Sequence, residues 1–343
     1  MLKFIEKYNT NNGEIFLWET KDTGYPIEST MMQDIRVNSD ARTSMNPSVI
    51  WNNLVPVSEK LLLTVSTQKG CAVGGGEGKG CTFCDVSDMP FKGNLIEEEM
   101  LDQIDMMLTV SPYYQFIHGK LLTNKAKIGF ARMGEPAHNL ENVLSVMQKL
   151  PKLYEDIKWL PCFNSIFPEK VMGGLTGLEV LTEVIKFKEK VYDGFLHLQI
   201  SANSTNEDDR AKLFRSNVIP LEDIINHVNR YRITNRTITL NFILMNGIEV
   251  NPAKLAKMGI CGDKFSIKLI PMNNTCMSEQ NNLTSVANYD NYDYFIKLKK
   301  EFESYDLKVI TDSTSRIENL SAICCGQLAR KAIKNETVFR NVC

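Results

Sequence analysis

From Leu61 onward, the chain alternates between short apolar runs and longer segments in which apolar residues recur every three or four positions. The short runs are typical of buried strands and the periodic segments of amphipathic helices. The predicted strands are Leu61–Ser66, Lys127–Ala131, Ile157–Phe163, Phe195–Ser201, Thr237–Leu244, Phe265–Ile270 and Leu307–Thr311. The predicted helices between them are Glu97–Leu108, Leu140–Leu150, Leu178–Lys188, Leu221–Arg230, Asn251–Met258 and Tyr289–Tyr305. This regular alternation predicts a parallel sheet covered by helices, and its six or seven units favour a barrel or partial barrel.

The first sixty residues are predicted to form a small, irregular accessory segment ahead of the barrel. Two runs with strand character, Glu14–Trp18 and Ile27–Met32, flank the turn-forming stretch Asp22–Pro26, and this arrangement predicts a hairpin. A polar stretch, 33–48, follows and is expected to form a loop. The predicted division of the chain is an accessory segment 1–60, a barrel 61–330 and a tail 331–343.

The charge balance limits the kind of substrate that the protein can hold. The chain of 343 residues carries a net charge of −2, whereas proteins that grip long nucleic acids through phosphates usually have a basic excess. Any contact with nucleic acid is therefore expected to be local, or the substrate to be small. No run approaches the roughly 18 apolar residues of a membrane span, and the first residues lack the pattern of a signal peptide. A cytoplasmic protein without membrane contact is expected.

The chain has nine cysteines, which in a cytoplasmic protein are not expected to form a disulfide framework. Metal binding or redox chemistry is the better interpretation of those that cluster. The isolated ones are predicted to be small buried hydrophobic residues, and they are Cys162, Cys261, Cys276 and Cys343.

Three cysteines, Cys71, Cys81 and Cys84, lie directly after the first predicted strand of the barrel. A [4Fe–4S] cluster takes four thiolates, so three protein ligands leave one iron open to a substrate or cofactor. A structural zinc site usually has four protein ligands, and the nearest histidines, His118 and His138, are distant in sequence. The pattern favours an iron–sulfur cluster, with zinc as the alternative.

A closing Cys-x-x-Cys on the first strand–helix loop of a barrel resembles the radical S-adenosylmethionine (radical SAM) superfamily. The usual spacing there is three residues and then two, whereas nine residues separate Cys71 from Cys81. Most of the extra residues are glycine, which indicates a loop that bulges outward while its ends stay close. Closing a loop that is a few residues longer costs little entropy.

An ordered series of short motifs narrows the resemblance to the RlmN/Cfr family of RNA adenine methyltransferases. The series covers roughly residues 14–330. Its members are Gln68-Lys69-Gly70-Cys71, Cys81-Thr82-Phe83-Cys84, Gly93-Asn94-Leu95, Met133-Gly134-Glu135-Pro136 with Asn139, Ile200-Ser201-Ala202-Asn203 with Asn206 and Arg210, Ile270-Pro271-Met272-Asn273, and Cys325-Gly326-Gln327-Leu328. The resemblance implies a partial (β/α)6 barrel of the radical SAM type with a short N-terminal extension.

The resemblance also implies two cofactors, a [4Fe–4S] cluster and S-adenosylmethionine. The open iron would chelate the amino and carboxylate groups of S-adenosylmethionine, and reduction of the cluster would generate a 5′-deoxyadenosyl radical. The carboxylate of Glu135 would receive the ammonium group of the cofactor, and Gly134 would allow close approach of the backbone. Other implied contacts come from Ser165, Ser201, Asn203 and Asn273. At two of these the match is looser, since Asn203 replaces the usual histidine of the family and Ser165 only approximates the position of its small polar residue.

Cys325 matches the family cysteine that is methylated by one S-adenosylmethionine before its methyl carbon is added to an adenine ring. A nucleophilic thiol in this role should be partly exposed at the barrel mouth. The family resolves the protein–RNA adduct with a second cysteine seven residues ahead of the first cluster ligand, where this chain has Thr64. Cys324 is a poor substitute because a disulfide between adjacent cysteines is strained.

Methylation of a carbon of a nucleobase, in RNA or a nucleotide, is thus the first functional hypothesis, with an electron donor such as flavodoxin or ferredoxin as partner. A second hypothesis is direct hydrogen abstraction from a modified nucleotide or peptide without methyl transfer. A third is a zinc-stabilised barrel that binds nucleic acid without catalysis. The segment 311–316 has few arginines for gripping RNA, and the basic residues Arg330, Lys331, Lys334 and Arg340 are predicted to form a solvated helix face.

Overall fold

The structure is a computed structural model, and it describes residues 1–10, 12–35, 52–75, 78–110, 123, 125–286, 292–311 and 324–334. Most of the predicted loop 33–48 lies outside these residues. His118, Arg340, Cys343 and nearly all of the segment 311–316 also lie outside them.

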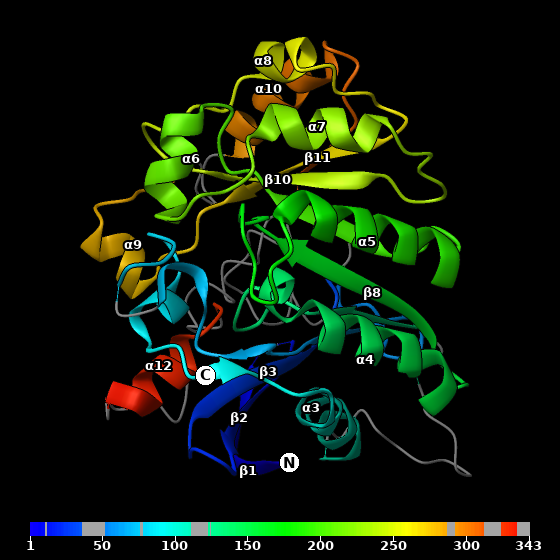
Figure 1. Ribbon diagram of the computed structural model, residues 1–343, viewed down its shortest axis with the longest axis vertical. Helices are drawn as coiled ribbons and strands as arrows, with labels where there is room; N and C mark the ends of the chain where they lie inside the picture. Colours follow the sequence, from blue (N-terminus) through cyan, green and yellow to red (C-terminus); the bar gives the residue numbers. More distant parts are fainter. Residues whose placement is uncertain are drawn as a thin grey trace.

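The described residues contain a ten-stranded sheet whose larger part is parallel (Figure 1). Its parallel strands follow chain order from one neighbour to the next. They are β4 (Leu61–Thr64), β7 (Lys125–Gly129), β8 (Lys158–Ser165), β9 (His197–Ser201), β10 (Ile238–Leu244), β11 (Phe265–Pro271) and a short β12 (Val309–Thr311). Because neighbours in sequence are neighbours in space, helices can connect them only by crossing over one face.

The connecting helices lie along the outside of this sheet, as α4, α5 and α7 do in Figure 1. The helices are α3 (Glu97–Val110), α4 (Leu140–Leu153), α5 (Gly177–Val191), α6 (Glu207–Phe214), α7 (Leu221–Asn229), α8 (Pro252–Lys257) and α10 (Tyr292–Glu303). All seven predicted strands and all six predicted helices are present, with ends displaced by at most three residues. The mixed α/β fold with a parallel, partial-barrel sheet is therefore confirmed. Helices α6 and α9 (Cys276–Gln280) were not predicted, because they are too short for a clear apolar period.

The N-terminal segment is more regular than its sequence pattern indicates. Strands β1 (Leu2–Thr10), β2 (Gly13–Thr20) and β3 (Pro26–Gln33) form an antiparallel meander, and β3 pairs antiparallel with β4. The predicted hairpin is confirmed as β2–β3. Most of β1 is exposed or only half-buried, so its sequence lacks the strong apolar alternation of a strand. The meander extends the sheet of the barrel, and the division of the chain at residue 60 stays a prediction.

The core lies between the sheet and its helices, where the apolar residues of strands and helices meet. Leu63 and Ile128 are buried from the sheet side, as are Val143, Val184 and Ile224 from the helices. Helix α5 begins with a capping box in which Thr176 accepts from the backbone of Glu179 and the Glu179 carboxylate accepts from the backbone of Thr176. This arrangement satisfies backbone donors at the point where the helix leaves the sheet.

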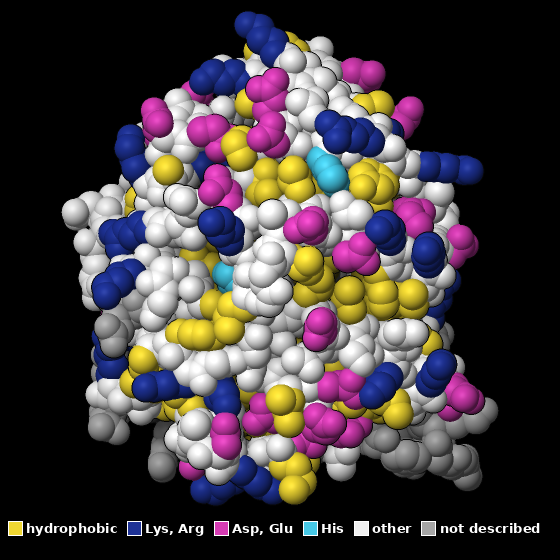
Figure 2. Space-filling view, in the orientation of Figure 1, with side chains coloured by type: hydrophobic (Ala, Val, Ile, Leu, Met, Phe, Trp, Pro, Cys, Tyr) yellow, Lys and Arg dark blue, Asp and Glu magenta, His cyan; other side chains and the backbone are white. Residues whose placement is uncertain are grey.

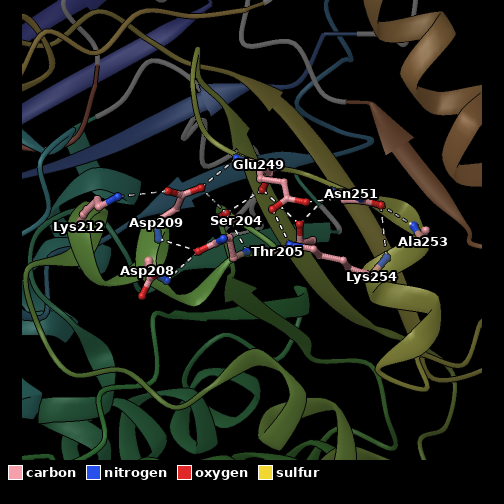
Figure 3. A network of polar contacts seen from close by, with 10 residues as sticks. Ser204, Thr205, Asp208, Asp209, Lys212, Glu249, Asn251, Ala253 and Lys254 are labelled. Carbon is pink, nitrogen blue, oxygen red and sulfur yellow. Dashed lines mark hydrogen bonds and ion pairs between the residues drawn. The ribbon is translucent and has the colours of Figure 1, made fainter.

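The loops that follow β9 and β10 are held together by a polar network (Figure 3). The Ser204 hydroxyl donates to the Glu249 carbonyl at 2.7 Å, and Asp209 accepts from the Glu249 backbone at 3.2 Å. Lys254 pairs with the Glu249 carboxylate at 2.6 Å. These contacts hold the two loops against each other at this end of the sheet.

None of the helices that the structure describes is long and apolar enough to cross a membrane.

One half-buried titratable group contributes to the dependence of stability on pH. Burial in the sheet, with Lys127 and Arg236 nearby, lowers the pKa of His197 to about 2. The folded chain keeps this ring neutral, whereas the unfolded chain binds a proton below about pH 6.5. Stability therefore falls as the pH drops below about 6.5. We expect His197→Gln to lose less stability than the wild type between about pH 7 and 5, measured by urea unfolding; equal losses would contradict the assignment.

Candidate active site

A cavity of about 600 Å³ opens at the carboxyl ends of the parallel strands. This volume is in the range of sites for small ligands and cofactors. The strand ends supply part of the wall, namely Thr64, Ser165, Ser201 and Pro271. The N-terminal meander supplies another part, through Asn12, Thr30, Met32 and Gln33. All three predicted cluster cysteines and Cys325 line the same cavity.

The three cysteines lie on a loop whose glycines allow its two ends to pack against each other. Gly74 has a φ of +67°, and a side chain there would meet the carbonyl oxygen of Lys79 at 2.2 Å. A side chain on Gly80 would meet the carbonyl oxygen of Val73 at 2.7 Å. The two described ends of the long insertion therefore lie in contact, as the glycine-rich sequence predicts.

The second half of the loop is fixed by Ser87. Its hydroxyl donates to the carbonyls of Cys81 and Cys84, at 3.0 and 2.7 Å, while the backbone of Cys84 donates to Cys81. The two cysteines of the Cys-x-x-Cys pair thus lie on one tight turn.

Burial raises the pKa of all three thiols, that of Cys71 to about 12, and for Cys81 the neighbouring thiols raise the pKa further. Without a metal ion these three thiols stay protonated. Thiolate sulfur is a soft ligand, so the three side chains suit iron or another thiophilic metal that would displace their protons. Among the described residues, no three His, Cys, Asp or Glu side chains converge on the position of a single metal ion.

Gln68 joins the cysteine loop to the predicted cofactor-binding motif. Its side-chain oxygen accepts from the backbone of Ala72 at 3.0 Å and from the backbone of Glu135 at 2.9 Å. Its side-chain nitrogen donates to Asn94 at 2.6 Å. Asn139 donates to the carbonyls of Thr67 and Leu95, both at 2.8 Å. The amides thus connect motifs that are far apart in sequence.

The Glu135 carboxylate lies in the cavity wall and is 5% exposed. It accepts from the backbone of Ala137 at 3.0 Å and of Ile166 at 3.1 Å. Burial raises its pKa to about 7, against the opposing effect of a hydrogen bond with Ser165. Among the described residues, no cation pairs with this carboxylate, so its charge is available for a ligand that carries one.

The other predicted cofactor contacts differ in position. Ser165, Ser201 and Asn273 line the cavity, and the buried Oδ1 atom of Asn273 has no hydrogen-bond partner within the described part of the chain. A ligand with a donor group would satisfy this atom. Asn203 does not line the cavity: it is fully buried with a φ of +59°, and its Oδ1 accepts from the backbone of Ile243. The structure thus brings three of these four side chains together.

Gly134 lies in the cavity wall at a φ of +97°. A side chain there would lie 2.6 Å from the Cβ and Cγ atoms of Gln68. A glycine is therefore needed here for two reasons: the side chain of Gln68 leaves no room for a Cβ atom, and the backbone has a positive φ. The sequence alone does not reveal the first reason.

Cys325 is exposed at the cavity, as expected for a reactive thiol, and its Sγ donates to the carbonyl of Ala131 at 3.6 Å. It lies ahead of helix α12 (Gln327–Lys334), which packs beside β3. Glu28 of β3 accepts from the backbone nitrogens of Gly326, Leu328 and Ala329, at 2.6, 3.0 and 3.0 Å.

Two charged residues near Cys325 were not found from the sequence. Glu28 is fully buried, and the guanidinium of Arg132, 5% exposed, pairs with it at 2.6 Å. The only signal that could have revealed Glu28 is a charge at an inward position of a predicted strand. Arg132 gave no signal, because it follows the β7 strand in a loop where charged residues are ordinary.

Two further expectations need correction. Cys261 is exposed, whereas Cys162 is buried as predicted, because Cys261 lies in the turn ahead of β11 and not in the core.

Arg330 does not face solvent: it is 5% exposed and pairs with Asp88 at 2.8 Å, and Lys334 pairs with the same carboxylate. Asp88 lies far away in sequence, so the pairing could not be expected.

The packing at Gly134 can be tested by substitution. Gly134→Ala should lower the free energy of unfolding by about 1–3 kcal/mol for the backbone strain, and further because Gln68 must move. Gly173→Ala is the matched control, since Gly173 also has a positive φ, +91°, but nothing lies near its missing side chain. Urea unfolding should show a larger loss at Gly134; equal losses would show that Gln68 yields without cost.

Comparison with known proteins gives sequence relatives named as RNA methyltransferases. The "dual-specificity RNA methyltransferase RlmN" of Syntrophotalea carbinolica is 27% identical over 231 residues, which are 66% of this chain and 54% of the relative. The probable RlmN of Chlorobaculum tepidum is 30% identical, over 60% of this chain and 49% of the relative. That of Aquifex aeolicus is 25% identical, over 83% and 74%. The chain thus spans about half the length of the first two.

No protein-family model matches the chain. A crystal structure of Streptococcus suis SuiB bound to S-adenosylmethionine aligns over 91% of this chain and 72% of its own, with a TM-score of 0.48 and 10% identity. A likeness of this degree carries no argument about activity. On its sequence, the chain is a relative of the curated proteins named dual-specificity RNA methyltransferase RlmN.

Proposed function

We propose that the protein is a radical SAM enzyme that methylates a carbon of a nucleobase in RNA, with Cys325 as the intermediate methyl carrier. One observation carries the proposal. The cavity that holds Cys71, Cys81 and Cys84 also holds Cys325, so a cluster and a methyl-carrying thiol would face one reaction space. The names of the sequence relatives support the same activity.

The proposal gives a role to the cysteines and to several polar side chains of the cavity. Cys71, Cys81 and Cys84 would hold a [4Fe–4S] cluster and leave one iron open. When bound, the cluster and S-adenosylmethionine supply the radical that starts the reaction. Glu135 would hold the ammonium group of S-adenosylmethionine, because it is a buried carboxylate without a cationic partner among the described residues. The free Oδ1 of Asn273 would accept from the same ligand, and Ser165 and Ser201 lie between these two residues along the strand order.

Thr64 favours a second candidate function. The side chain lines the cavity, and its hydroxyl is hydrogen-bonded to that of Thr30. A hydroxyl cannot form the disulfide that would release a protein–RNA adduct. A radical SAM enzyme that abstracts hydrogen from a modified nucleotide or peptide, without methyl transfer, needs no such thiol. A zinc-stabilised barrel without catalysis is not favoured, because the relatives are named as enzymes.

The surface bears on the size of the substrate. On the face shown in Figure 2, lysine and arginine side chains alternate with acidic ones and form no continuous basic area. Such a face does not favour a long duplex gripped through its phosphates. We infer that a short single-stranded region or a nucleotide enters the cavity, in the cytoplasm, and that flavodoxin or ferredoxin supplies the electron.

The cluster ligands can be tested one by one. Cys71→Ala, Cys81→Ala and Cys84→Ala should each abolish most of the bound iron and sulfide after anaerobic reconstitution, because two thiolates do not hold a cubane stably. Cys261→Ala is the control, since this thiol is exposed outside the cavity. Iron and sulfide analysis and the visible spectrum are the measurements. A colourless wild-type protein with one zinc would overturn the proposal.

Methyl transfer is tested with labelled S-adenosylmethionine. We expect the purified enzyme to carry one extra methyl group on Cys325, found by peptide mass spectrometry, and labelled carbon to move into a base of total RNA. Cys325→Ala should lose the transfer completely and retain its iron. If this variant instead forms 5′-deoxyadenosine and modifies its substrate normally, the second candidate is correct and the methyl carrier is not Cys325.

A further inference from the structure

The inner face of the parallel sheet carries two lysines outside the cavity already described. Lys127 of β7 pairs in register with Leu62 of β4, which lines the cavity. Lys268 of β11 lies two residues before Ile270, which also lines it. Paired residues of neighbouring strands share a face, and so does every second residue along one strand. Both lysines therefore point to the inside of the partial barrel.

Arg236 and His197 lie at the amino ends of two neighbouring strands of this sheet. His197 begins β9, and Arg236 comes two residues before β10, so both are at the opposite end of the strands from the predicted cluster ligands. His197 shares the inner face, because Ser201, four residues later in the same strand, lines the cavity. A guanidinium nitrogen of Arg236 is hydrogen-bonded to Nε2 of His197.

This contact determines which nitrogen of His197 carries the hydrogen. The ring is neutral, since burial and nearby cations lower its pKa to about 2. A guanidinium can only donate, so Nε2 accepts, and in a neutral ring the hydrogen is then on Nδ1. Nδ1 of His197 and Nε of Arg236 are both buried, and neither has a hydrogen-bond partner among the described residues. The two unsatisfied atoms are therefore both donors.

The charges that act on His197 are positive. The two lysines and Arg236 all lower its pKa, and so does Lys60, which differs from them because it pairs with Asp34 at 2.6 Å. Arg236 is half-buried, and no carboxylate of the described chain forms an ion pair with it. A guanidinium in such a place is costly without a counter-charge. Two unsatisfied donors among several cations are the surroundings that suit an anion.

We propose that this end of the inner face binds a phosphate group, with Arg236 and His197 as hydrogen-bond donors and with Lys127 and Lys268 as further positive charges. A phosphate presents several acceptor oxygens around one centre, and the fork of a guanidinium matches two of them. The ligand class is a terminal phosphate, either free or esterified to a small molecule. The site lies away from the cavity, so it does not depend on the proposed methyl transfer.

A purely structural role for Arg236 would be to hold the start of β10 against β9 through His197. In that role the guanidinium needs no ligand, and its loss destabilises the fold equally with and without phosphate. In a phosphate site, Arg236 contributes to stability when the anion is bound, whereas without the anion it adds repulsion among the cations. The two roles therefore differ in how stability responds to phosphate.

Isothermal titration calorimetry of the full chain, at low ionic strength and in a buffer without phosphate, measures the binding. Inorganic phosphate or pyrophosphate should bind to the wild type at one site. Arg236→Gln should weaken this binding by roughly tenfold or more, and Arg236→Lys by less, because lysine keeps the charge but lacks the fork.

Arg232→Gln is the matched control for Arg236→Gln. Arg232 lies in the same connection between α7 and β10, is exposed, and its replacement changes the net charge by the same amount. It should leave the affinity for both anions unchanged. If Arg232→Gln weakens binding as much as Arg236→Gln does, the anions respond only to overall charge and the proposal is wrong.

Two further probes identify the source of the phosphate. Ribose 5-phosphate carries an esterified terminal phosphate, and a short oligouridylate without terminal phosphates carries only diesters. If ribose 5-phosphate binds as tightly as inorganic phosphate and needs Arg236, the ligand is a phosphorylated small molecule; if only the inorganic anions bind, it is free phosphate or pyrophosphate. Binding of the oligouridylate that needs Arg236 and is tighter than that of pyrophosphate would indicate a nucleic-acid backbone and overturn the proposal.

Thermal unfolding gives an independent measurement. Phosphate should raise the Tm of the wild type and of Arg232→Gln, but not that of Arg236→Gln. If Arg236→Gln does not fold, the double variant Lys127→Gln with Lys268→Gln takes its place, since both lysines are only half-buried, and it should bind phosphate several-fold more weakly. Wild-type binding by this folded double variant would overturn the proposal, as would a wild type that binds neither anion.

Discussion

The buried carboxylate of Glu28 determines where both the cysteine turn and the last described helix can lie. It comes from β3 of the N-terminal meander, and it binds three backbone nitrogens at the start of α12 as well as the Arg132 guanidinium. A buried carboxylate is costly unless its oxygens are satisfied, and here each oxygen has partners. The contact therefore joins the two ends of the described chain and places Cys325 at the cavity.

The parallel sheet supplies the rest of the site through a general property of its topology. Parallel strands that follow one another in sequence deliver all their carboxyl ends to the same edge. The loops after β4, β7, β8, β9 and β11 therefore meet there, although their residues are up to 200 positions apart. Side-chain amides then connect these loops, as Gln68 does between the cysteine loop and Glu135. The order of the parallel strands thus determines where the cavity lies, and the residues of the loops determine which chemical groups line it.

One residue of this cavity departs from the pattern of the family that the sequence resembles at a position that matters for the proposed chemistry. Thr64 lies where the family has its resolving cysteine, and its hydroxyl is hydrogen-bonded to that of Thr30. Arg132 lines the same cavity and pairs with the buried carboxylate of Glu28. The threonine cannot act as the redox partner that a cysteine at this position would be. In the proposed methyl transfer, release of the product would therefore need a route other than a disulfide from this position.

The sequence by itself determined the strands and helices of the barrel, because burial on one face imposes a period on apolar residues that is visible without coordinates. It also predicted three cysteines as cluster ligands from their spacing and Cys325 as a reactive thiol from the family resemblance, and the structure brings all four to one cavity. The sequence could not show that Glu28 and Arg132 pair, that Gln68 requires the glycine at 134, or that Arg330 is buried against Asp88. Those contacts join residues far apart in the chain, and only the tertiary structure decides which distant side chains lie within a few ångströms of each other.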